Sequence, residues 1–473
     1  MNFATLQFIL FFLVVFLIYW NIKGKYQNAF LLAVSYLFYS FWDWRFLLPI
    51  AVTTLTDYFC GRKISASGSL SAKKAWLTTS LMVNLGILGY FKYFNFFAES
   101  AAAGFRYLGW PISSATFHIL LPVGISFYTF RSLSYVLDIY RGREKPVDSL
   151  LPYALFVSYF PHLAAGPITR AGQFIPQIER PRLFTGIDLQ EGIVRFIQGY
   201  FKKVFIADTL GFYLVDPLFS DPDRYAAAFH WLAMLGYSVQ IYADFSGYSS
   251  MAIGISRILG LRLPENFQFP HLSRNISDFW RRWHITMSQF FRDYVYIALG
   301  GNRGTRLGTA GNLVITTFLS GLWHGAGFTY IFWGLLHGLY IVVYHFWSAI
   351  RTRFGAANRP LIVGATFLSW VVTQMAVGLA WILFRSPDVS TSFRFLRGLA
   401  LSSGEAPLDL PLRIWIALLF FAIDHLAGSI GEKQGEIHFR IPVALKGFYY
   451  AAMIVFLYEM RIEVASPFIY FKY

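Results

Sequence analysis

The residues best suited to chemistry in this sequence are His284 and His324, which lie in stretches dominated by aromatic and small residues. An imidazole in an apolar segment must find a hydrogen-bond partner, stay neutral or carry protons. A neutral histidine can take the proton of a hydroxyl while that hydroxyl attacks an acyl carbon. Acyl transfer to an alcohol is therefore chemically consistent with the pair, and a buried structural histidine is the alternative for each residue alone.

His324 lies in the stretch "SGLWHGAG", where Gly325 and Gly327 allow the backbone to turn. We therefore expect His324 to mark a break between two helical pieces. An ionisable residue at membrane depth is a functional candidate by default. His337 lies thirteen residues further on and would point away from His324 on a continuous helix, so we assign His337 to packing or to support of the site.

His284 belongs to the segment 257–306, which holds eight arginines, no lysine and three acidic residues. Helical periodicity predicts one amphipathic helix here, capped by Ser277 and ending at "GGNRG". The helix is too polar on one side to span lipid, so we expect an amphipathic and re-entrant segment at the cytoplasmic boundary. Its apolar face comprises Trp280, Trp283, His284, Met287, Phe290, Phe291 and Tyr294, which directs His284 inward.

The elements that must position these histidines are apolar helices. The chain is 56% hydrophobic and only 14% charged, whereas a soluble domain carries about 25% charged residues. Its apolar runs have the length of a bilayer span, ~20 residues. The sequence therefore predicts an all-α polytopic membrane protein with roughly a dozen transmembrane or re-entrant helices. These lie near 3–20, 28–43, 46–60, 75–96, 117–138, 149–165, 190–215, 226–256, 310–323, 328–349, 361–384, 411–429 and 443–461.

No Ser/Gly linker or long soluble segment divides the chain, which predicts a single integral-membrane domain over residues 1–473. The lone cysteine, Cys60, excludes an internal disulfide and gives no metal framework, so no metal site is expected. The sequence also lacks a Gly-x-Ser-x-Gly elbow, a HExxH motif and a phosphate-cradling loop. These gaps argue against the commonest hydrolase, metalloprotease and nucleotide-binding sites.

The net charge of +15 is concentrated in short loops. The loops 62–74 and 141–148 are basic, and Lys23 and Lys25 follow the first apolar run. By the positive-inside rule these loops lie in the cytoplasm and the N-terminus lies outside. The basic charge therefore indicates contact with the lipid bilayer and its anionic headgroups, and no nucleic-acid partner is expected.

The sequence "DFWRRWHITMSQFFRDYVYIALGGNRG", followed by "SGLWHGAGFTYIFWGLLHG", closely resembles the membrane-bound O-acyltransferase (MBOAT) superfamily. Within it, the chain resembles the bacterial branch whose members act in alginate O-acetylation or in D-alanyl transfer to teichoic acids. The stretches 121–142, 160–174 and 242–254 extend the likeness over nearly the whole chain. The resemblance implies a ring of tilted helices around a central tunnel, in which an acyl thioester enters from the cytoplasm and the acceptor from the opposite face.

Matched motif to motif, His324 takes the essential catalytic position as a general base or hydroxyl-polarising group, and His284 orients or assists it. The motif companions are assigned to shaping the tunnel or binding the substrate; these are Trp323, Trp283, Asp278, Arg292, Asn302 and Arg303. Each has a structural alternative, such as helix capping for Asp278 or contact with lipid phosphates for Arg292. Asp244 is either a pathway residue or a hydrogen-bond hub.

The resemblance implies an O-acyltransferase of the bacterial inner membrane that binds no cofactor permanently and uses acetyl-CoA as donor. It would serve O-acetylation of an exported polysaccharide, together with a separate periplasmic partner of SGNH-hydrolase type. One alternative is D-alanyl transfer from a thioester on a small acyl carrier protein to teichoic acid. Another is a proton-coupled transporter, for which we would expect inverted repeats and several intramembrane acids; only Asp244 fits that description.

Overall fold

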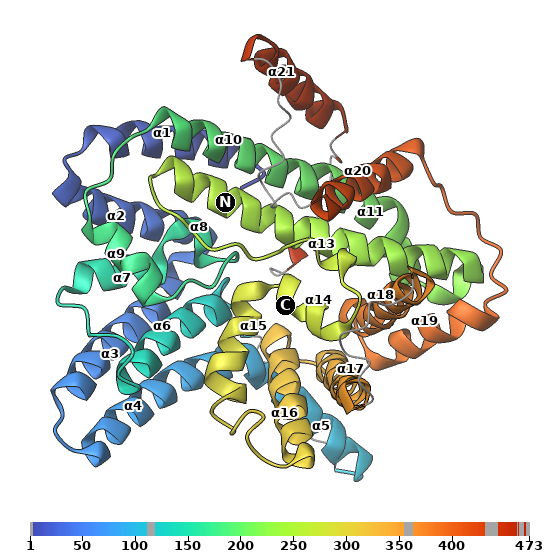
Figure 1. Ribbon diagram of the computed structural model, residues 1–473, viewed down its shortest axis with the longest axis horizontal. Helices are drawn as coiled ribbons and strands as arrows, with labels where there is room; N and C mark the ends of the chain where they lie inside the picture. The colour runs from blue at the N-terminus through green and yellow to red at the C-terminus, as the bar shows by residue number, and fades with distance from the viewer. Residues whose placement is uncertain are drawn as a thin grey trace. The chain divides into compact units, whose positions relative to one another are not determined.

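The computed structural model describes residues 3–110, 119–353, 363–430, 443–460, 462 and 468–469. These residues form helices and connecting loops, with no strand among them beyond one isolated bridge between Ala226 and Ser403. Figure 1 shows the helices in chain order. The predicted all-α class is therefore confirmed. The chain divides into two compact units, residues 1–194 with 252–264 and residues 195–251 with 265–473.

The first unit is built from helices that follow the apolar runs of the N-terminal part. They are α1 (Leu6–Asn21), α2 (Gly24–Asp43), α3 (Leu47–Ala66), α4 (Leu70–Leu88), α5 (Phe94–Tyr107), α6 (Ile125–Tyr140), α7 (Leu150–Ser158), α8 (Phe160–Leu163), α9 (Ala171–Glu179) and the start of α10 (Gly186–Phe201). Polar side chains join neighbouring helices inside this unit. The buried carboxylate of Asp57 on α3 accepts hydrogen bonds from Ser80 and Asn84 on α4, at 2.6 and 2.8 Å. Because a buried charge needs such partners, these bonds fix how α3 and α4 pack.

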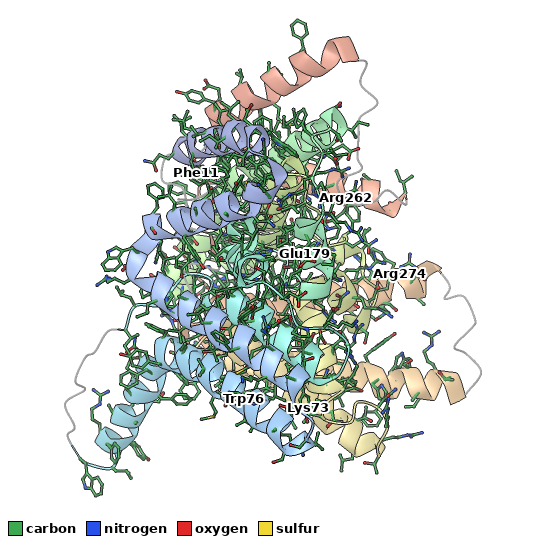
Figure 2. All side chains as sticks on the ribbon, turned by 90° about the vertical axis from the view of Figure 1, so that its left-hand side faces the viewer. Phe11, Lys73, Trp76, Glu179, Arg262 and Arg274 are labelled. Carbon is green, nitrogen blue, oxygen red and sulfur yellow. The ribbon has the colours of Figure 1, made fainter. Side chains whose placement is uncertain are left out.

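The basic loop 62–74 covers the end of α3, the turn and the start of α4. Ser69 caps α4 by accepting a hydrogen bond from the backbone N–H of Ala72. Lys73 and Trp76 lie one helical turn apart at this end of α4 (Figure 2). The basic side chains therefore gather at one end of a helix pair, as the positive-inside pattern requires.

The second unit holds the segments that carry the candidate histidines. Its helices are the end of α10, α11 (Asp208–Leu210), α12 (Asp216–Ser220), most of α13 (Ala227–Ile258), α14 (Ile276–Arg282), α15 (Ile285–Phe291), α16 (Arg306–His324), α17 (Phe328–Arg353), α18 (Val363–Arg385), α19 (Val389–Leu401), α20 (Leu412–Ser429) and α21 (Val443–Met460). Within the residues that the structure describes, four π-helical turns interrupt the helices of both units, at Gly89–Tyr93, Lys202–Ala207, Gly211–Val215 and Arg292–Tyr296. Such turns shift the helical register and are frequent at functional sites.

Helices α16 and α17 pack closely against each other (Figure 1). Three glycines make this possible, because a side chain on any of them would collide with the partner helix. A Cβ on Gly321 would meet the carbonyl oxygen of Tyr330, and one on Gly334 would meet that of Thr317. Gly338 faces Thr317 and Val314 in the same way. Small residues at a helix crossing are a standard route to close packing in lipid.

Among the residues with a described structure, three helices are long and apolar enough to cross a membrane, over Phe328–Thr352, Gly364–Arg385 and Leu412–Ser429. Helices also cover most of the other predicted spans in the part of the chain that the structure describes. Their number as membrane crossings, and their arrangement in a ring around a tunnel, stay predictions. The first residues predicted at 117–138 and 361–384 and the last at 443–461 lie outside the described residues.

Candidate functional site

The segment around His284 is two short helices and not one continuous helix, so this part of the prediction was wrong. Helix α14 ends at Arg282 and α15 begins at Ile285. His284 has a left-handed backbone with φ of 41°. The cap of α14 is Asn275, whose side chain accepts from the N–H of Asp278 at 2.8 Å, and not Ser277. The predicted apolar face is nevertheless buried, except for a half-buried Trp280.

The loop 266–268 stabilises the break between α14 and α15 by hydrogen bonds to its backbone. The N–H of Gln268 donates to the carbonyl of Arg282 at 2.9 Å, and the N–H of Ile285 donates to the carbonyl of Asn266 at 2.9 Å. These are backbone groups that a continuous helix would have paired internally, and inside a protein they need partners. Residues 266–268 supply the partners, which explains why the chain turns at His284.

The imidazole of His284 is fully buried. Its Nδ1 lies 3.1 Å from Oδ1 of Asn266, and its ring packs edge-on against Phe245 with centroids 4.6 Å apart. Burial lowers the pKa of His284 to about 3, because desolvation penalises the charged form. The imidazole is therefore neutral at physiological pH, and one of its two ring nitrogens carries a lone pair.

His324 is the last residue of α16, and the helix stops at Gly325 before α17 begins at Phe328. The predicted helix break at His324 is therefore confirmed. The His324 side chain is buried, and its ring centroid lies 6.5 Å from that of His284. Two imidazoles that are forty residues apart in sequence thus face one small region of the second unit.

Aromatic rings surround this histidine pair. Trp323 lies beside both rings, with centroids 5.7 Å from His284 and 4.8 Å from His324. Trp333 and Phe384 cover the other sides of His324 at 5.0 and 5.2 Å. Such a wall excludes water and strengthens electrostatic interactions within it.

His337 lies closer to His324 than a continuous helix would allow, because the chain turns between α16 and α17. The ring of Trp333 contacts both histidines, with centroids 5.0 Å from His324 and 4.8 Å from His337. The indole N–H of Trp280 donates to Nδ1 of His337 at 3.3 Å. The assignment of His337 to packing or support stays a prediction.

The predicted binding residues fall into two groups. Trp323 and Trp283 are buried with the histidines; Trp283 stacks on Phe279 and contacts Trp381 at 5.1 Å. The four polar residues have other surroundings: Asp278 pairs with Arg282 of its own helix, Arg292 pairs with Asp293, and Asn302 and Arg303 are exposed in the turn before α16. The assignment of these four residues to substrate binding stays a prediction.

Asp244 on α13 lies in a buried ion-pair cluster. Its carboxylate is 2.7 Å from Nζ of Lys203, which also contacts Asp208 at 2.7 Å. It further accepts a hydrogen bond from the backbone N–H of Ile469 at 2.8 Å. These contacts support the hydrogen-bond hub over the pathway residue.

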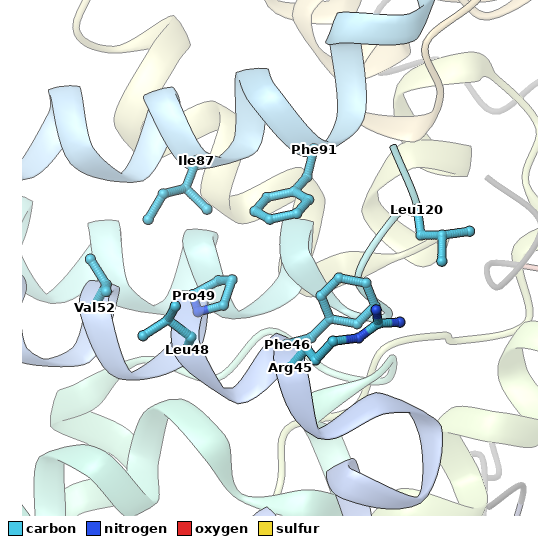
Figure 3. Close-up of a pocket in the computed structure, with 8 residues that line it drawn as sticks. All are labelled: Arg45, Phe46, Leu48, Pro49, Val52, Ile87, Phe91 and Leu120. Atoms are coloured by element: carbon cyan, nitrogen blue, oxygen red, sulfur yellow. The ribbon is translucent and has the colours of Figure 1, made fainter. Parts of the chain in front are cut away.

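A separate apolar hollow lies in the first unit (Figure 3), with a volume of about 550 Å³. Its lining residues are Arg45, Phe46, Leu48, Pro49, Val52, Ile87, Phe91 and Leu120. Arg45 is its one charged member, and the guanidinium is already paired with Asp43 at 2.6 Å. The residues that line the hollow therefore include no side chain suited to proton transfer, and the histidine pair is the better candidate for an active site.

Sequence reasoning missed Asn266, Trp381 and Phe384. Trp381 and Phe384 lie on α18, and nothing in their local pattern separates them from other lipid-facing or packing aromatics. Asn266 had a visible signal, since it is a polar residue in the short apolar run between Pro264 and Pro270. Together these residues enclose the two imidazoles in largely apolar walls, and an imidazole in its neutral form can accept a proton from a hydroxyl.

Comparison with known proteins agrees with this chemistry. The profile of the membrane-bound O-acyltransferase family matches residues 147–385, which include both histidines. The probable alginate O-acetylase AlgI of Pseudomonas aeruginosa is 43% identical, over 83% of this chain and 74% of that protein. The peptidoglycan O-acetyltransferase of Helicobacter pylori is 35% identical, over 84% and 79%. The teichoic acid D-alanyltransferase of Bacillus subtilis is 29% identical, over 55% and 68%. The chain therefore belongs to the membrane-bound O-acyltransferase family.

Proposed function

We propose that this O-acetyltransferase moves acetyl groups from cytoplasmic acetyl-CoA into the O-acetylation of an exported polysaccharide, with His324 as general base. The single observation that carries the proposal is the buried pair of imidazoles, His284 and His324, with ring centroids 6.5 Å apart inside an aromatic wall. Two buried imidazoles from separate segments can supply the general base and the orienting group that acyl transfer to a hydroxyl uses.

In the proposed reaction, His324 takes the proton of an acceptor hydroxyl while the hydroxyl oxygen bonds to the thioester carbonyl carbon. The tetrahedral intermediate then collapses, the C–S bond breaks, and the imidazolium returns the proton to the leaving thiolate. The products are an acetyl ester and free CoA thiol. His284 orients the hydroxyl from the other side of the reacting atoms, and the buried tryptophans keep water from competing as acceptor.

Acetyl-CoA would be a substrate and no cofactor would stay bound. Its phosphates suit the arginines at the edge of the site, because a guanidinium binds phosphate in a bidentate manner. We assign this role to Arg292 and Arg303, both exposed, with Asp278 and Asn302 shaping the same mouth. Trp283 and Trp323 would line the path between this mouth and His324.

The proposed setting is the bacterial inner membrane, with the N-terminus outside and the segment 257–306 at the cytoplasmic side of one integral-membrane domain. A separate periplasmic partner of SGNH-hydrolase type would pass the acetyl group to the polysaccharide. Relatives named for alginate and peptidoglycan O-acetylation, each matching more than four fifths of this chain, support acetyl as the group transferred. The proteins named for D-alanyl transfer match only 55% and 58% of it.

The test follows ester-linked label in exported glycans after a pulse of radiolabelled acetate. Cells carrying wild type, His324→Ala or an empty locus are compared at matched membrane levels of the protein. The matched control is His345→Ala, because His345 is an exposed histidine on α17 outside the aromatic cluster. We expect label with wild type and with the control, and background label with His324→Ala and the empty locus.

Each other outcome changes the assignment. Label in His324→Ala at the wild-type level would return His324 to a packing role. Equal absence of label in all cultures would exclude acetyl as the transferred group. D-alanyl transfer from a carrier-protein thioester would then be tested with labelled D-alanine.

A further inference from the structure

We propose that Asn266 positions His284 and holds the proton of its imidazole on Nδ1, so that Nε2 is the nitrogen that accepts a hydrogen bond from the substrate. The inference rests on the proposed function, since it gives His284 a defined part in the acyl transfer. It concerns a residue outside the two histidine motifs, eighteen positions before His284 in the sequence.

The orientation of the Asn266 side chain is fixed by its other contacts. The backbone N–H of Thr286 points at Oδ1 of Asn266 at 3.3 Å, and a backbone N–H can only donate. The hydroxyl of Thr286 also donates to this oxygen, at 2.9 Å, while Nδ2 of Asn266 donates to Ser249 at 3.3 Å. A flipped amide would bring two donors together at Thr286. The atom facing His284 is therefore an oxygen.

The tautomer of His284 follows from this oxygen. Its Nδ1 lies 3.1 Å from Oδ1 of Asn266, with both groups fully buried. An unprotonated Nδ1 would place two lone pairs against each other without water to separate them, whereas a protonated Nδ1 donates a hydrogen bond. In a neutral imidazole the remaining nitrogen, Nε2, then carries the lone pair.

His337 provides an internal contrast in the same unit. Its Nδ1 receives a hydrogen bond from the indole N–H of Trp280, a group that can only donate. His337 therefore keeps its proton on Nε2, the opposite tautomer to His284. Two buried histidines of the same unit thus carry their protons on different nitrogens. In each case one hydrogen-bond partner decides the position of the proton, Asn266 for His284 and Trp280 for His337.

The assignment defines what His284 does in the proposed reaction. With a lone pair at Nε2, His284 accepts the hydrogen bond of the acceptor hydroxyl as that group binds, and the same single proton then passes to His324. His284 cannot donate a hydrogen bond to the oxyanion of the intermediate. Asn266 touches neither substrate nor reacting atoms, so it is a positioning residue. It also caps α15 by accepting from Thr286, and a purely structural cap is the alternative that the experiment must separate.

The first test replaces Asn266 by Asp and measures the pH profile of acetyl transfer. Inverted membrane vesicles with the complete export machinery are supplied with radiolabelled acetyl-CoA between pH 5 and 9, and ester-linked label is counted. Asp keeps an oxygen for Nδ1–H and for Thr286, but its negative charge favours imidazolium. Among the ring contacts of His284 in the described part of the chain, His324 is a titratable side chain, and all variants retain it.

We expect Asn266→Asp to acquire an acid limb above pH 5, with the rate falling as pH falls, because the carboxylate raises the midpoint by about two to three pH units from the wild-type value of about 3. Asn266→Leu should lose about 10- to 100-fold in rate at every pH, the size of loss seen when the outer partner of a metal-binding histidine is removed. Ser249→Ala is the matched control, because it removes a bond to the same amide but leaves Oδ1 in place. Its rate and profile should stay within about twofold of wild type.

The second test reads the tautomer directly and needs no activity. Protein labelled with ¹⁵N-histidine is examined by NMR in detergent, and the His284 signals are identified by their absence in His284→Asn. We expect Nδ1 of His284 to be the protonated nitrogen in wild type and in Ser249→Ala, with a mixture of tautomers in Asn266→Leu. A single Nε2-protonated form in wild type would overturn the inference.

The two proposals fail differently. Full activity of His324→Ala and His284→Asn would remove the proposed mechanism, whatever the tautomer. Loss of activity in those variants, combined with a wild-type pH profile in Asn266→Asp and an unchanged tautomer in Asn266→Leu, would leave the mechanism standing and reduce Asn266 to a structural cap.

Discussion

At the scale of single residues, the unusual feature is a bulky side chain held in a left-handed backbone. Within the described residues, His284 and Phe269 are the two non-glycine positions with positive φ, at 41° and 46°. This conformation costs of order 1 kcal/mol or more and persists where surrounding bonds over-determine it. Asn266 supplies those bonds, through its backbone carbonyl to Ile285 and its side chain to Thr286. These hydrogen bonds therefore hold the backbone of His284 in the left-handed conformation, and this conformation determines where its imidazole points.

A prediction at this scale concerns the pH dependence of stability. Burial holds the pKa of His284 at about 3 in the folded protein, against about 6.5 in the unfolded chain. Between these values the unfolded chain binds the proton and the folded protein does not. Stability is therefore complete above about pH 6.5 and falls as pH drops towards 3, by up to about 1.4 kcal/mol per pH unit.

The measurement is the thermal midpoint in detergent at pH 7.5, 6.5 and 5.5, for wild type and His284→Asn. Asparagine tolerates a left-handed backbone and does not titrate. We expect the midpoint of wild type to fall more steeply with acid than that of the variant. Parallel slopes would mean that His284 is not the buried neutral group described here.

At the scale of elements, the positions of the helices and the end of α16 could be predicted from the sequence, because both depend on local composition. Apolar runs located the helices, and Gly325 located the end of α16 at His324. The break between α14 and α15 was not predictable in this way, because the segment 277–304 has an unbroken helical pattern. Its cause is the loop 266–268, which pairs the freed backbone groups from outside the pattern. The close approach of His337 to His324 likewise depends on tertiary packing.

The glycine crossing of α16 and α17 carries the prediction at this scale. Gly321 lies one turn before His324, and a Cβ there would collide with the carbonyl oxygen of Tyr330. We expect Gly321→Ala to push the helices apart, to destabilise the protein by about 1–3 kcal/mol and to lower acetyl labelling at least about tenfold through misplacement of His324.

The matched control is Gly311→Ala on the same helix, where nothing lies within 4 Å of the added Cβ. Alanine should stabilise that turn by up to about 1 kcal/mol and leave labelling unchanged. The comparison uses labelled acetate and thermal midpoints at equal membrane levels. Equal effects of the two substitutions would show that the crossing does not govern the site.

At the scale of the whole molecule, the proposed reaction moves an acetyl group from one side of a membrane to the other. The proposed donor is cytoplasmic, and in this proposal the polysaccharide is modified outside. The proposed mechanism requires the side of the membrane that carries the basic loops to be the side on which the donor is found. The charge pattern predicts which side this is, because the loop 62–74 carries four basic residues and no acidic one, whereas "WDWR" at 42–45 is balanced. The positive-inside rule therefore places the loop 62–74 in the cytoplasm and "WDWR" outside.

Cysteine labelling tests this topology in a favourable background. Cys60 is the only cysteine of the chain and is 2% exposed, so the wild-type protein should stay unlabelled. Trp44→Cys replaces a side chain that is 72% exposed, and Gly68→Cys introduces a thiol with no atom within 4 Å of its Cβ. We expect a membrane-impermeant maleimide to label Trp44→Cys in intact spheroplasts, and Gly68→Cys only after lysis. The reverse pattern would place the N-terminus in the cytoplasm.

In that case the arginine-rich segment that follows α13 would face away from acetyl-CoA, and the donor would have to reach His324 from the opposite side.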